Sequence, residues 1–471
     1  MGVIDVEGAA FDEQVMKSNI PVVVDLWAEW CGPCVKPDTI ILGDNKPISK
    51  IEDGNRVFSL TGHVEVTKTF ERPYKGDLIS IKGCGMLPVQ ATPEHPILVS
   101  TSKSSDRIDS LSEPYWKEAG DLVAKNKDND GDYLVMPRLK GTVAVKVIDL
   151  QKYIDAKNLN MAKAKGVPLN FPLNEDTAWL LGIYVAEGNT SDNAVVFNLG
   201  GREIELQKRI AVVGRQLGYS PCISATRNGA CKVSIKSRML ARAFPEWCGK
   251  LAPNKKIPDF IILHKNEKII KAFVEGYLAG DGNMSRNSIY PDSIVQNARS
   301  TSKMLMMQLQ LLYARMGIFA TIILAGKGGP AKILGRNVIT HDIYTLSFAK
   351  SGKTQAKIED KRILVPVRSI KHIPYEGNVC NLETRDNTYL VNNAVVHNCR
   401  MYSPVVDEVS AEYEGKVKFV KINVDNNEEL AKKYNIMSIP TTLLIEKGKL
   451  KAMNVGAVPK EALKKWIDKN L

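Results

Sequence analysis

The pattern of apolar and polar positions changes along the chain and divides it into three kinds of segment. At both ends, strand patterns alternate with helix patterns. Residues 22–27 form a run that begins with three β-branched valines and is apolar except for Asp25, and residues 416–422 alternate between apolar and polar side chains. A continuous apolar run is typical of a strand that is buried on both faces. Strands that alternate with helices predict an α/β layer fold for the two ends of the chain.

Residues 34–140 and 363–398 have another pattern. Short apolar strands, such as residues 56–60, 78–81 and 378–383, follow one another without long helical stretches. Many short strands separated by turns are typical of all-β domains. We therefore expect these two segments to form an all-β region.

Residues 170–350 contain longer helix patterns and one repeated motif. Residues 179–188 and 273–282 each form an apolar helix pattern with small residues, ending in an acid followed by glycine. Small residues allow two helices to pack closely, which would bring the terminal acids Glu187 and Asp281 together. One copy alone is more often an ordinary core helix, but two copies 94 residues apart predict a paired-helix unit.

The two outer segments are the halves of one interrupted motif. Residues 30–34 read WCGPC, and residues 399–404 read CRMYSP. Joining Pro33 directly to Cys399 gives the continuous motif WCGPCRMYSP. The rejoined sequence has 106 residues and resembles thioredoxins over its whole length. The insertion is therefore the most informative feature of the chain.

The resemblance to thioredoxins implies roles for four residues. Cys31 would be the attacking thiolate, and Cys399 would be the resolving cysteine once the pieces are joined. Asp25 would pass a proton to the resolving thiol, and Pro440 would lie in the cis-proline loop that faces the disulfide. Thioredoxin reductase and disulfide-containing proteins are the implied partners, with no bound cofactor. A Cys-x-x-Cys pair is also half of many zinc sites, but no second pair lies within metal-ligand spacing.

The inserted residues 34–398 resemble an intein at their N-terminal end. Cys34 would attack the carbonyl carbon of Pro33 and convert that peptide bond into a thioester. A thiol suits this step because it is nucleophilic at neutral pH and leaves readily afterwards. Thr92 and His95 match the Thr-x-x-His pattern of the family. The match implies that both contact the N-terminal junction and that His95 donates a proton to the departing amine.

The C-terminal end of the insert completes this resemblance. Cys399 would accept the acyl group by transthioesterification, and the side-chain amide of Asn398 would then attack its own carbonyl carbon to form a succinimide. His397 would assist that cyclisation. Two positions depart from the family pattern, because Asn381 replaces a common aspartate and Asn387 lies where a histidine is often found. An asparagine can form hydrogen bonds but cannot act as a general base.

Residues 170–350 resemble the LAGLIDADG homing endonucleases. The resemblance implies that Glu187 and Asp281 bind Mg²⁺, which activates water and stabilises the leaving oxygen of a phosphodiester. In the basic block between the two motifs, Lys256 is expected to be catalytic rather than Lys255. The implied partner is double-stranded DNA, namely the intein-free thioredoxin gene. The alternative is an insert that splices but whose central domain only binds DNA.

The net charge of +12 is unevenly distributed along the chain. Residues 34–398 carry 50 basic and 36 acidic side chains, whereas the outer segments carry 14 and 16. A basic domain indicates an anionic partner, nucleic acid first. Eight cysteines are too few for a secreted disulfide scaffold, and no apolar run is long enough to span a bilayer. We therefore expect a cytoplasmic protein without a membrane partner. A stable fusion that never splices and acts as a DNA-binding module is a further interpretation.

The expected architecture is multidomain. A thioredoxin-like α/β domain is split between residues 1–33 and 399–471. An all-β Hint domain, the horseshoe-shaped splicing fold that inteins share with hedgehog autoprocessing domains, is divided between residues 34–140 and 363–398. An α+β LAGLIDADG domain occupies residues 170–350.

Overall fold

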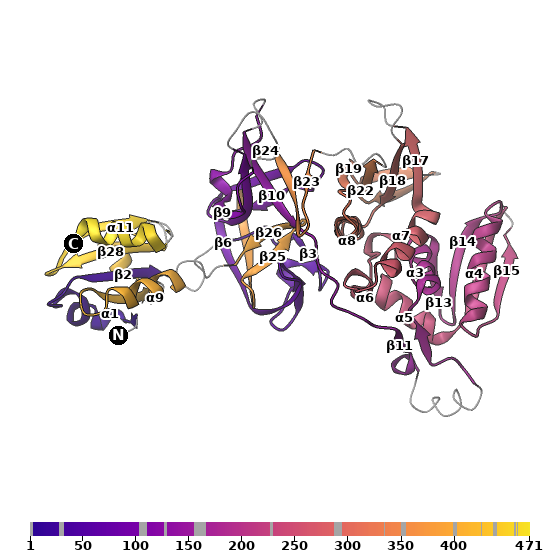
Figure 1. Cartoon of the computed structure of the whole chain (residues 1–471), viewed down its shortest axis with the longest axis horizontal. Helices are drawn as coiled ribbons and strands as arrows, with labels where there is room; N and C mark the ends of the chain where they lie inside the picture. Colours follow the sequence, from indigo (N-terminus) through magenta and orange to yellow (C-terminus); the bar gives the residue numbers. More distant parts are fainter. Residues whose placement is uncertain are drawn as a thin grey trace.

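The computed structural model describes residues 3–27, 33–102, 111–126, 130–154, 166–226, 229–286, 294–333, 335–349, 355–398, 403–424, 426–436, 440–455, 458 and 460–471. Figure 1 shows three groups of secondary structure along the longest axis, with both chain ends in the same group. No helix in these ranges is both long enough and apolar enough to cross a membrane. Cys31 and Cys399 lie outside the described residues.

The two outer segments form one sheet with the strand order β1-β27-β2-β28-β29. Its strands are β1 (Ile4–Asp5), β2 (Val22–Trp27), β27 (Lys418–Asn423), β28 (Thr441–Glu446) and β29 (Lys449–Val455). Strand β2 lies parallel to β27 and antiparallel to β28. A strand from the N-terminal segment therefore occupies the centre of the sheet, between two strands from the C-terminal segment.

Side chains of β2 alternate between two apolar cores, one on each face of the sheet. Val22 and Val24 pack into the first core, and Val23 packs into the second. The first core is covered by α1 (Gly8–Phe11), the π-helix that continues it through Asp12–Met16, and α10 (Glu428–Lys433). The second is covered by α9 (Ser403–Glu412) and α11 (Lys460–Asn470). Burial on both faces explains the continuous apolar run and confirms the expected α/β layers.

The middle group is a nearly closed, barrel-like sheet with the strand order β25-β26-β8-β10-β24-β6-β5, to which β7, β9 and β23 add side pairs. The strands are β5 (Arg56–Phe58), β6 (His63–Gly83), β7 (Val89–Ala91), β8 (Pro96–Ser102), β9 (Tyr115–Glu118), β10 (Gly131–Pro137), β23 (Lys357–Ile358), β24 (Arg362–Thr384), β25 (Thr388–Val391) and β26 (Ala394–His397). A two-stranded ribbon, β3 (Ile40–Ile41) with β4 (Lys46–Pro47), precedes them. Strands from before and after residues 141–356 are interleaved, so neither segment forms this sheet alone (Figure 1).

Strands β6 and β24 are much longer than the short strands expected from the sequence. They pair antiparallel over most of their lengths. The breakers Pro73 and Pro374 lie opposite Asn378 and Asp77 in this pairing. The Cys380 N–H points away from β6, to the Val35 carbonyl oxygen, and Asn378 and Pro374 face the same way because they lie an even number of residues before Cys380. Both prolines therefore lie in non-hydrogen-bonded pairs, where the missing N–H removes no ladder hydrogen bond.

The third group repeats one order of elements: a helix, two strands, a second helix and two or more strands. The first copy contains α3 (Glu175–Glu187), β13 (Gly188–Ser191), β14 (Ala194–Gly200), α4 (Ile204–Gln216), β15 (Pro221–Ala225) and β16 (Ala230–Lys236). The second contains α7 (Glu267–Asp281), β17 (Gly282–Arg286), β18 (Ile294–Ser300), α8 (Lys303–Arg315), β19 (Thr321–Gly326), β20 (Gly329–Ile333), β21 (Arg336–Thr340) and β22 (Ile343–Ala349). Helices α5 (Arg238–Cys248) and α6 (Asp259–Ile262) connect them. The four-stranded sheets, β13-β14-β16-β15 and β17-β18-β22-β19, give the α+β architecture that the sequence predicts.

Residues before 170 also pack on this third group. Strand β11 (Val147–Asp149) pairs with β12 (Asn170–Pro172). The Lys152 ammonium lies 2.9 Å from the Glu246 carboxylate of α5. The segment that precedes α3 is therefore part of this unit and extends it beyond the range read from the sequence.

Candidate functional sites

Cys34 and Thr92 are joined by two hydrogen bonds. The Cys34 N–H donates to Thr92 Oγ1 at 3.0 Å, and the Thr92 N–H donates to the Cys34 carbonyl oxygen at 2.9 Å. The next residue, Val35, bridges Ala91 of β7 and Cys380 of β24. Cys34 is 3% exposed. Thr92 thus holds both backbone polar groups of the residue that follows the expected cleavage site.

His95 is fully buried next to this pair. Burial lowers the pKa of His95 to about 3, and the charge of His397 acts in the same direction. Among the described residues, neither ring nitrogen of His95 has a hydrogen-bond partner of standard geometry. The nearby Cys34 backbone nevertheless opposes the lowering of the His95 pKa. The ring contacts Tyr389 edge-on. The imidazole is therefore neutral at pH 7, and it would have to receive a proton before it could donate one.

Arg72 of β6, which belongs to no motif in the sequence, lies next to the Cys34 thiol. Burial raises the pKa of that thiol to about 11, and the charge of Arg72 and its hydrogen bond to the thiol oppose this shift. Arg72 Nη2 lies 3.1 Å from Glu94 Oε1, which fixes the guanidinium. Glu94 lies between Thr92 and His95 in the sequence. An acidic residue inside the Thr-x-x-His motif was therefore the one hint that a basic partner lies nearby.

His397 and Asn398 lie at the end of β26. His397 Nδ1 is 2.8 Å from the Asn398 carbonyl oxygen. Asn398 Nδ2 donates to Asn387 Oδ1 at 3.2 Å, and the Asn398 N–H donates to the Asn387 carbonyl oxygen at 3.0 Å. Burial lowers the pKa of His397, although its contact with the Asn398 backbone opposes the shift. A neutral His397 protonated on Nδ1 would donate to the carbonyl that Asn398 is expected to attack.

Both asparagines that depart from the intein pattern make hydrogen bonds in this region. Asn387 has a left-handed φ of 61°, which asparagine tolerates, and it holds the Asn398 side chain. Asn381 Oδ1 accepts hydrogen bonds from the Leu382 N–H and the Tyr389 hydroxyl, both at 2.8 Å. Its buried Nδ2 has no partner in the described part of the chain. Each asparagine therefore contributes hydrogen bonding, which needs no charge.

The two ends of the insert meet in the barrel-like sheet. Val396 of β26 pairs with Ile97 of β8, and His95 directly precedes β8. His95 and His397 are near enough for the charge of one to lower the pKa of the other. The structure therefore gathers in one region the residues Cys34, Thr92, His95, His397 and Asn398.

The outer sheet places Asp25 and Pro440 at neighbouring positions. Asp25 of β2 is 2% exposed, and burial raises its pKa to about 7, with the charge of Lys421 opposing the shift. Pro440 directly precedes β28, whose first residue, Thr441, pairs with Leu26. Cys31, expected near both, lies outside the described ranges.

Helices α3 and α7 cross at two glycines. A Cβ atom on Gly182 would lie 2.0 Å from the Phe273 carbonyl oxygen, and a Cβ atom on Gly276 would lie 2.1 Å from the Trp179 carbonyl oxygen. The two contacts are equivalent, because Trp179 and Gly182 precede Phe273 and Gly276 by the same 94 residues. The helices therefore form the close, symmetric pair that the repeated motif predicts, and larger side chains would separate them.

The same symmetry places Glu187 and Asp281 at the ends of the paired helices. Burial raises the pKa of Asp281 to about 6, and burial with the charge of Asp281 raises that of Glu187. Two partly desolvated carboxylates fit a divalent cation, which would relieve their repulsion. No group of three His, Cys, Asp or Glu residues in the described ranges could hold a metal ion. Mg²⁺ would therefore take its other ligands from water and phosphate oxygens, as it commonly does.

Of the two lysines in the basic block, Lys255 lies closer to these acids. Its Nζ donates to the carbonyl oxygens of Tyr184 and Gly188 at 2.8 and 2.7 Å, at the end of α3. Burial lowers its pKa to about 8, and the two motif acids are among the groups that oppose this shift. The charge of Lys256, the residue expected from the sequence, acts instead on Asp259.

Family profiles match two parts of the chain. The profile described as Thioredoxin matches residues 2–41 and 395–469, and the profile described as LAGLIDADG-like domain matches residues 268–351. The first match is split as the interrupted motif predicts. The second includes Asp281 but not Glu187.

Thioredoxins are similar to the outer part of the chain. Thioredoxin 1 of Nostoc sp. is 49% identical over 73 residues, which cover 16% of this chain and 68% of that protein. The thioredoxin of Synechocystis sp. is 52% identical over 73 residues with the same coverage.

A longer similarity extends to proteins of other descriptions. The ATP-dependent DNA helicase Hel308 of Thermococcus kodakarensis is 29% identical over 407 residues, which cover 78% of this chain and 36% of the helicase. An iron–sulfur cluster assembly SufBD family protein of Mycobacterium tuberculosis is 26% identical over 443 residues, which cover 85% of this chain and 47% of that protein. The chain thus spans less than half the length of these relatives. Because the outer segments contain only 106 residues, both matches must include most of residues 34–398.

Proposed function

Because this chain belongs to the thioredoxin family and carries a LAGLIDADG-like domain inserted into its thioredoxin sequence, we propose that it is a precursor that removes residues 34–398 by protein splicing. The observation that carries the proposal is the meeting of both ends of the insert in one sheet, where Val396 pairs with Ile97. Splicing needs this proximity because an acyl group passes from one junction to the other. The barrel-like sheet would then be a Hint-type splicing domain.

The longer relatives support an insert that can move between unrelated hosts. Their matches include most of residues 34–398, yet their names describe a helicase and a cluster-assembly protein rather than thioredoxins. A segment that removes itself leaves the host sequence intact, so it can occur in proteins of any function.

The first step would break the Pro33–Cys34 peptide bond. Cys34 Sγ forms a bond to the Pro33 carbonyl carbon, and the bond from that carbon to the Cys34 nitrogen breaks. Neutral His95 would take the thiol proton and return it to the leaving nitrogen. Thr92 would hold the Cys34 N–H and carbonyl in place through both transfers. The products are a thioester and a free amine on Cys34.

The later steps would release the insert and join its neighbours. Cys399 Sγ takes the acyl group from Cys34 Sγ, which leaves as a thiol. Asn398 Nδ2 then bonds to the Asn398 carbonyl carbon, and the bond from that carbon to the Cys399 nitrogen breaks. A hydrogen bond from His397 would stabilise the negative charge that develops on the carbonyl oxygen. The freed Cys399 amine finally attacks the Pro33 carbonyl carbon, and Cys399 Sγ leaves as a thiol. A peptide bond then joins Pro33 to Cys399.

Intact-mass analysis of the chain after expression under reducing conditions tests this proposal. Dividing 52.1 kDa in the ratio of 365 to 106 residues gives species of about 40 and about 12 kDa. The smaller species should contain a Pro33–Cys399 peptide bond. A single, persistent species of 52.1 kDa would instead support a stable fusion.

Replacement of Arg72 by glutamine is expected to slow the first step and to shift its pH dependence to higher pH. Arg72 lowers the pKa of the Cys34 thiol, so without its charge the thiolate forms only at higher pH. Thiol-induced cleavage at the N-terminal junction, followed by mass at a series of pH values, should be on the order of tenfold slower at neutral pH. Arg72→Lys should recover part of the rate, and Arg56→Gln should change nothing. An unaltered pH profile in Arg72→Gln would contradict this role.

We further propose that the released insert is a DNA endonuclease. Glu187 and Asp281 would hold Mg²⁺, which supplies activation of water and neutralisation of charge on the phosphate. The contacts of Lys255 favour it over Lys256 as the lysine nearest the reacting groups. The alternative, a central domain that binds DNA without cleaving it, has the same fold and the same two acids, and it predicts binding without cleavage in Mg²⁺.

The spliced product would be a thiol–disulfide oxidoreductase in which Asp25 serves as the buried proton carrier. Asp25→Asn is expected to stabilise it at alkaline pH, because the folded state raises the pKa of Asp25 from 3.8 to about 7. Ionisation therefore costs folding free energy that grows as pH rises through this window, by roughly 4 kcal/mol at most. Denaturant unfolding of both forms measures the difference. It should vanish below the lower pKa, and a pH-independent difference would contradict the assignment.

A further inference from the structure

Helix α8 belongs to the LAGLIDADG part of the chain, but its buried amides also bind two turns of the middle group, at Asn45 between β3 and β4 and at Gly85 after β6. Gln308 and Gln310 are 0% and 1% exposed. Gln308 Nε2 donates to Asn45 Oδ1 at 3.0 Å, and Gln310 Nε2 donates to the Gly85 carbonyl oxygen at 2.9 Å. Because buried amides need their partners, these contacts fix the position of the helix on the sheet.

Gln310 also holds the turn that leads to the C-terminal junction. Asn393 Nδ2 donates to Gln310 Oε1 at 2.8 Å and to the Met307 carbonyl oxygen at 3.0 Å. Asn393 is 1% exposed and lies in the two-residue turn between β25 and β26. Strand β26 begins at the next residue and ends at His397, so Asn398 is only five residues from this contact.

The rest of the β25–β26 hairpin is held by the barrel-like sheet, because Tyr389, Leu390 and Val395 are buried in its core and the Tyr389 hydroxyl donates to Asn381. Strand β26 pairs with β8 at one position, Val396 with Ile97. At the turn, Asn392 Nδ2 donates to the Pro88 carbonyl oxygen at 2.6 Å. Helix α8 therefore supports one end of a short hairpin whose other end carries the reacting asparagine.

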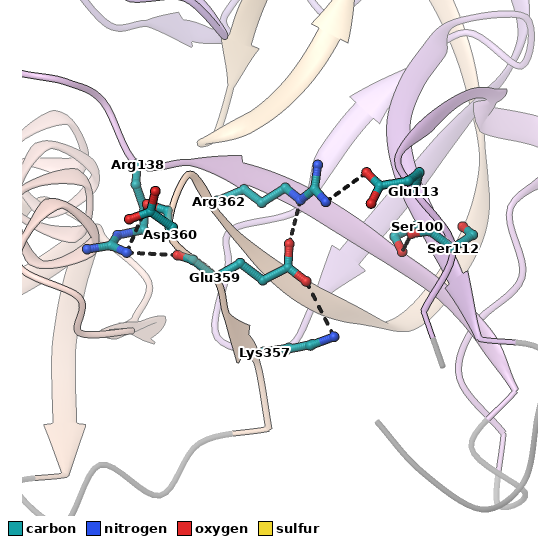
Figure 2. A network of polar contacts seen from close by, with 8 residues as sticks. All are labelled: Ser100, Ser112, Glu113, Arg138, Lys357, Glu359, Asp360 and Arg362. Atoms are coloured by element: carbon teal, nitrogen blue, oxygen red, sulfur yellow. Dashed lines mark hydrogen bonds and ion pairs between the residues drawn. The ribbon is translucent and has the colours of Figure 1, made fainter. Parts of the chain in front are cut away.

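Arg138 connects α8 to both segments through which the chain passes between the barrel-like sheet and the LAGLIDADG part. Figure 2 shows Arg138 beside the turn at Glu359 and Asp360, whose carbonyl oxygens accept from Nη1 at 2.8 and 2.9 Å. Arg138 Nε donates to the Ala314 carbonyl oxygen, near the C-terminal end of α8, at 2.9 Å. Arg362 holds the same turn through the Glu359 carboxylate at 2.6 Å. The helix is therefore anchored where the chain leaves the sheet and where it returns.

We propose that α8 is a positioning element for the cyclisation of Asn398, acting through Gln310 and Asn393. The LAGLIDADG part would then be needed for efficient C-terminal cleavage, whether or not it cleaves DNA. This inference rests on the proposed splicing reaction. Cyclisation requires Asn398 Nδ2 to reach its own carbonyl carbon, and small displacements of reacting groups slow such reactions strongly.

Glycine replacements in the turn provide a matched pair of variants of the full chain. Asn392 and Asn393 both have positive φ, which glycine adopts without strain, but only Asn393 binds α8. Asn393→Gly should slow C-terminal cleavage on the order of tenfold or more, and Asn392→Gly by less than about threefold. Thiol-induced N-terminal cleavage should change by less than about twofold in both, which shows that the sheet remains folded. Each cleavage is followed by intact mass, the C-terminal one with Cys34→Ala present and the N-terminal one with Asn398→Ala present.

A double-mutant cycle tests the partner on α8. Gln310→Leu should slow the same step, and the slowing in the double variant should be smaller than the product of the two separate effects, because both substitutions remove the contact between Gln310 and Asn393. Equal slowing by the two glycine variants, a parallel fall in N-terminal cleavage, or additive effects in the cycle would each overturn the role of α8. If the parent cleaves at both junctions and Asn393→Gly matches its rates, this inference fails alone. If the parent cleaves at neither junction, the proposed splicing fails as well.

Discussion

Replacement of Asn398 by alanine is expected to abolish cleavage at the C-terminal junction while the N-terminal junction stays reactive. The side-chain amide of Asn398 is the proposed nucleophile, and alanine offers none. The rate of C-terminal cleavage should fall on the order of 10³-fold or more. Intact mass should show loss of residues 1–33 on addition of a thiol, while residues 399–471 remain attached to the insert. The thioester steps do not use the side chain of Asn398, so they should continue.

Asn387 and Asn337 supply graded controls for this experiment. Asn387→Ala removes the oxygen that holds Asn398 Nδ2, so it should slow cyclisation on the order of tenfold without stopping it. Asn337 is exposed on β21, and its alanine variant should splice at the rate of the parent. Persistent C-terminal cleavage in Asn398→Ala would mean that another group breaks this bond.

Replacement of Asp281 by asparagine is expected to eliminate DNA cleavage while DNA binding is retained. Asparagine has nearly the same shape as aspartate but cannot supply the charge that holds a divalent cation. Cleavage of a plasmid that carries the uninterrupted thioredoxin coding sequence, assayed with Mg²⁺, should fall on the order of 10³-fold. Burial already disfavours the ionised form of Asp281, so the substitution should not destabilise the domain.

Glu275 provides the matched control, because it is an exposed acid on the same helix α7. Glu275→Gln should cleave DNA like the parent. If the parent insert binds the plasmid but leaves it intact in Mg²⁺, the proposal of an active endonuclease is wrong and the alternative of DNA binding alone is favoured.

The parts of the fold that were predictable from the sequence depend on local pattern or on repetition. The run at residues 22–27 indicated a strand buried on both faces, and β2 has that position. The motif copies at Gly182 and Gly276 indicated close helix packing, because each position leaves no room for a Cβ. The family profile likewise confirms the interruption that was read from the broken motif.

The contacts that were missed join residues far apart in sequence. Arg72 reaches Cys34 through the pairing of β6 with β24, whose register cannot be read from either strand alone. The glutamines of α8 offered a weaker signal. Every residue from Leu305 to Ala314 is buried, and polar amides in a helix covered on all sides must find partners. Their partners at Gly85 and Asn393 become apparent only once the interleaved sheet is assembled.

The strand order of the outer sheet has a consequence for the time during which the protein is synthesised. Strand β2 emerges before the insert, whereas its neighbours β27 and β28 emerge after it. At about 5–20 residues per second, the ribosome needs roughly 20–70 s to make the intervening 365 residues. Throughout this interval Val22–Trp27 is a nascent apolar strand whose two edges have no partner in the sheet, the kind of segment that promotes aggregation. The insert can fold as it emerges. The thioredoxin part is therefore most dependent on chaperones while the insert is being translated.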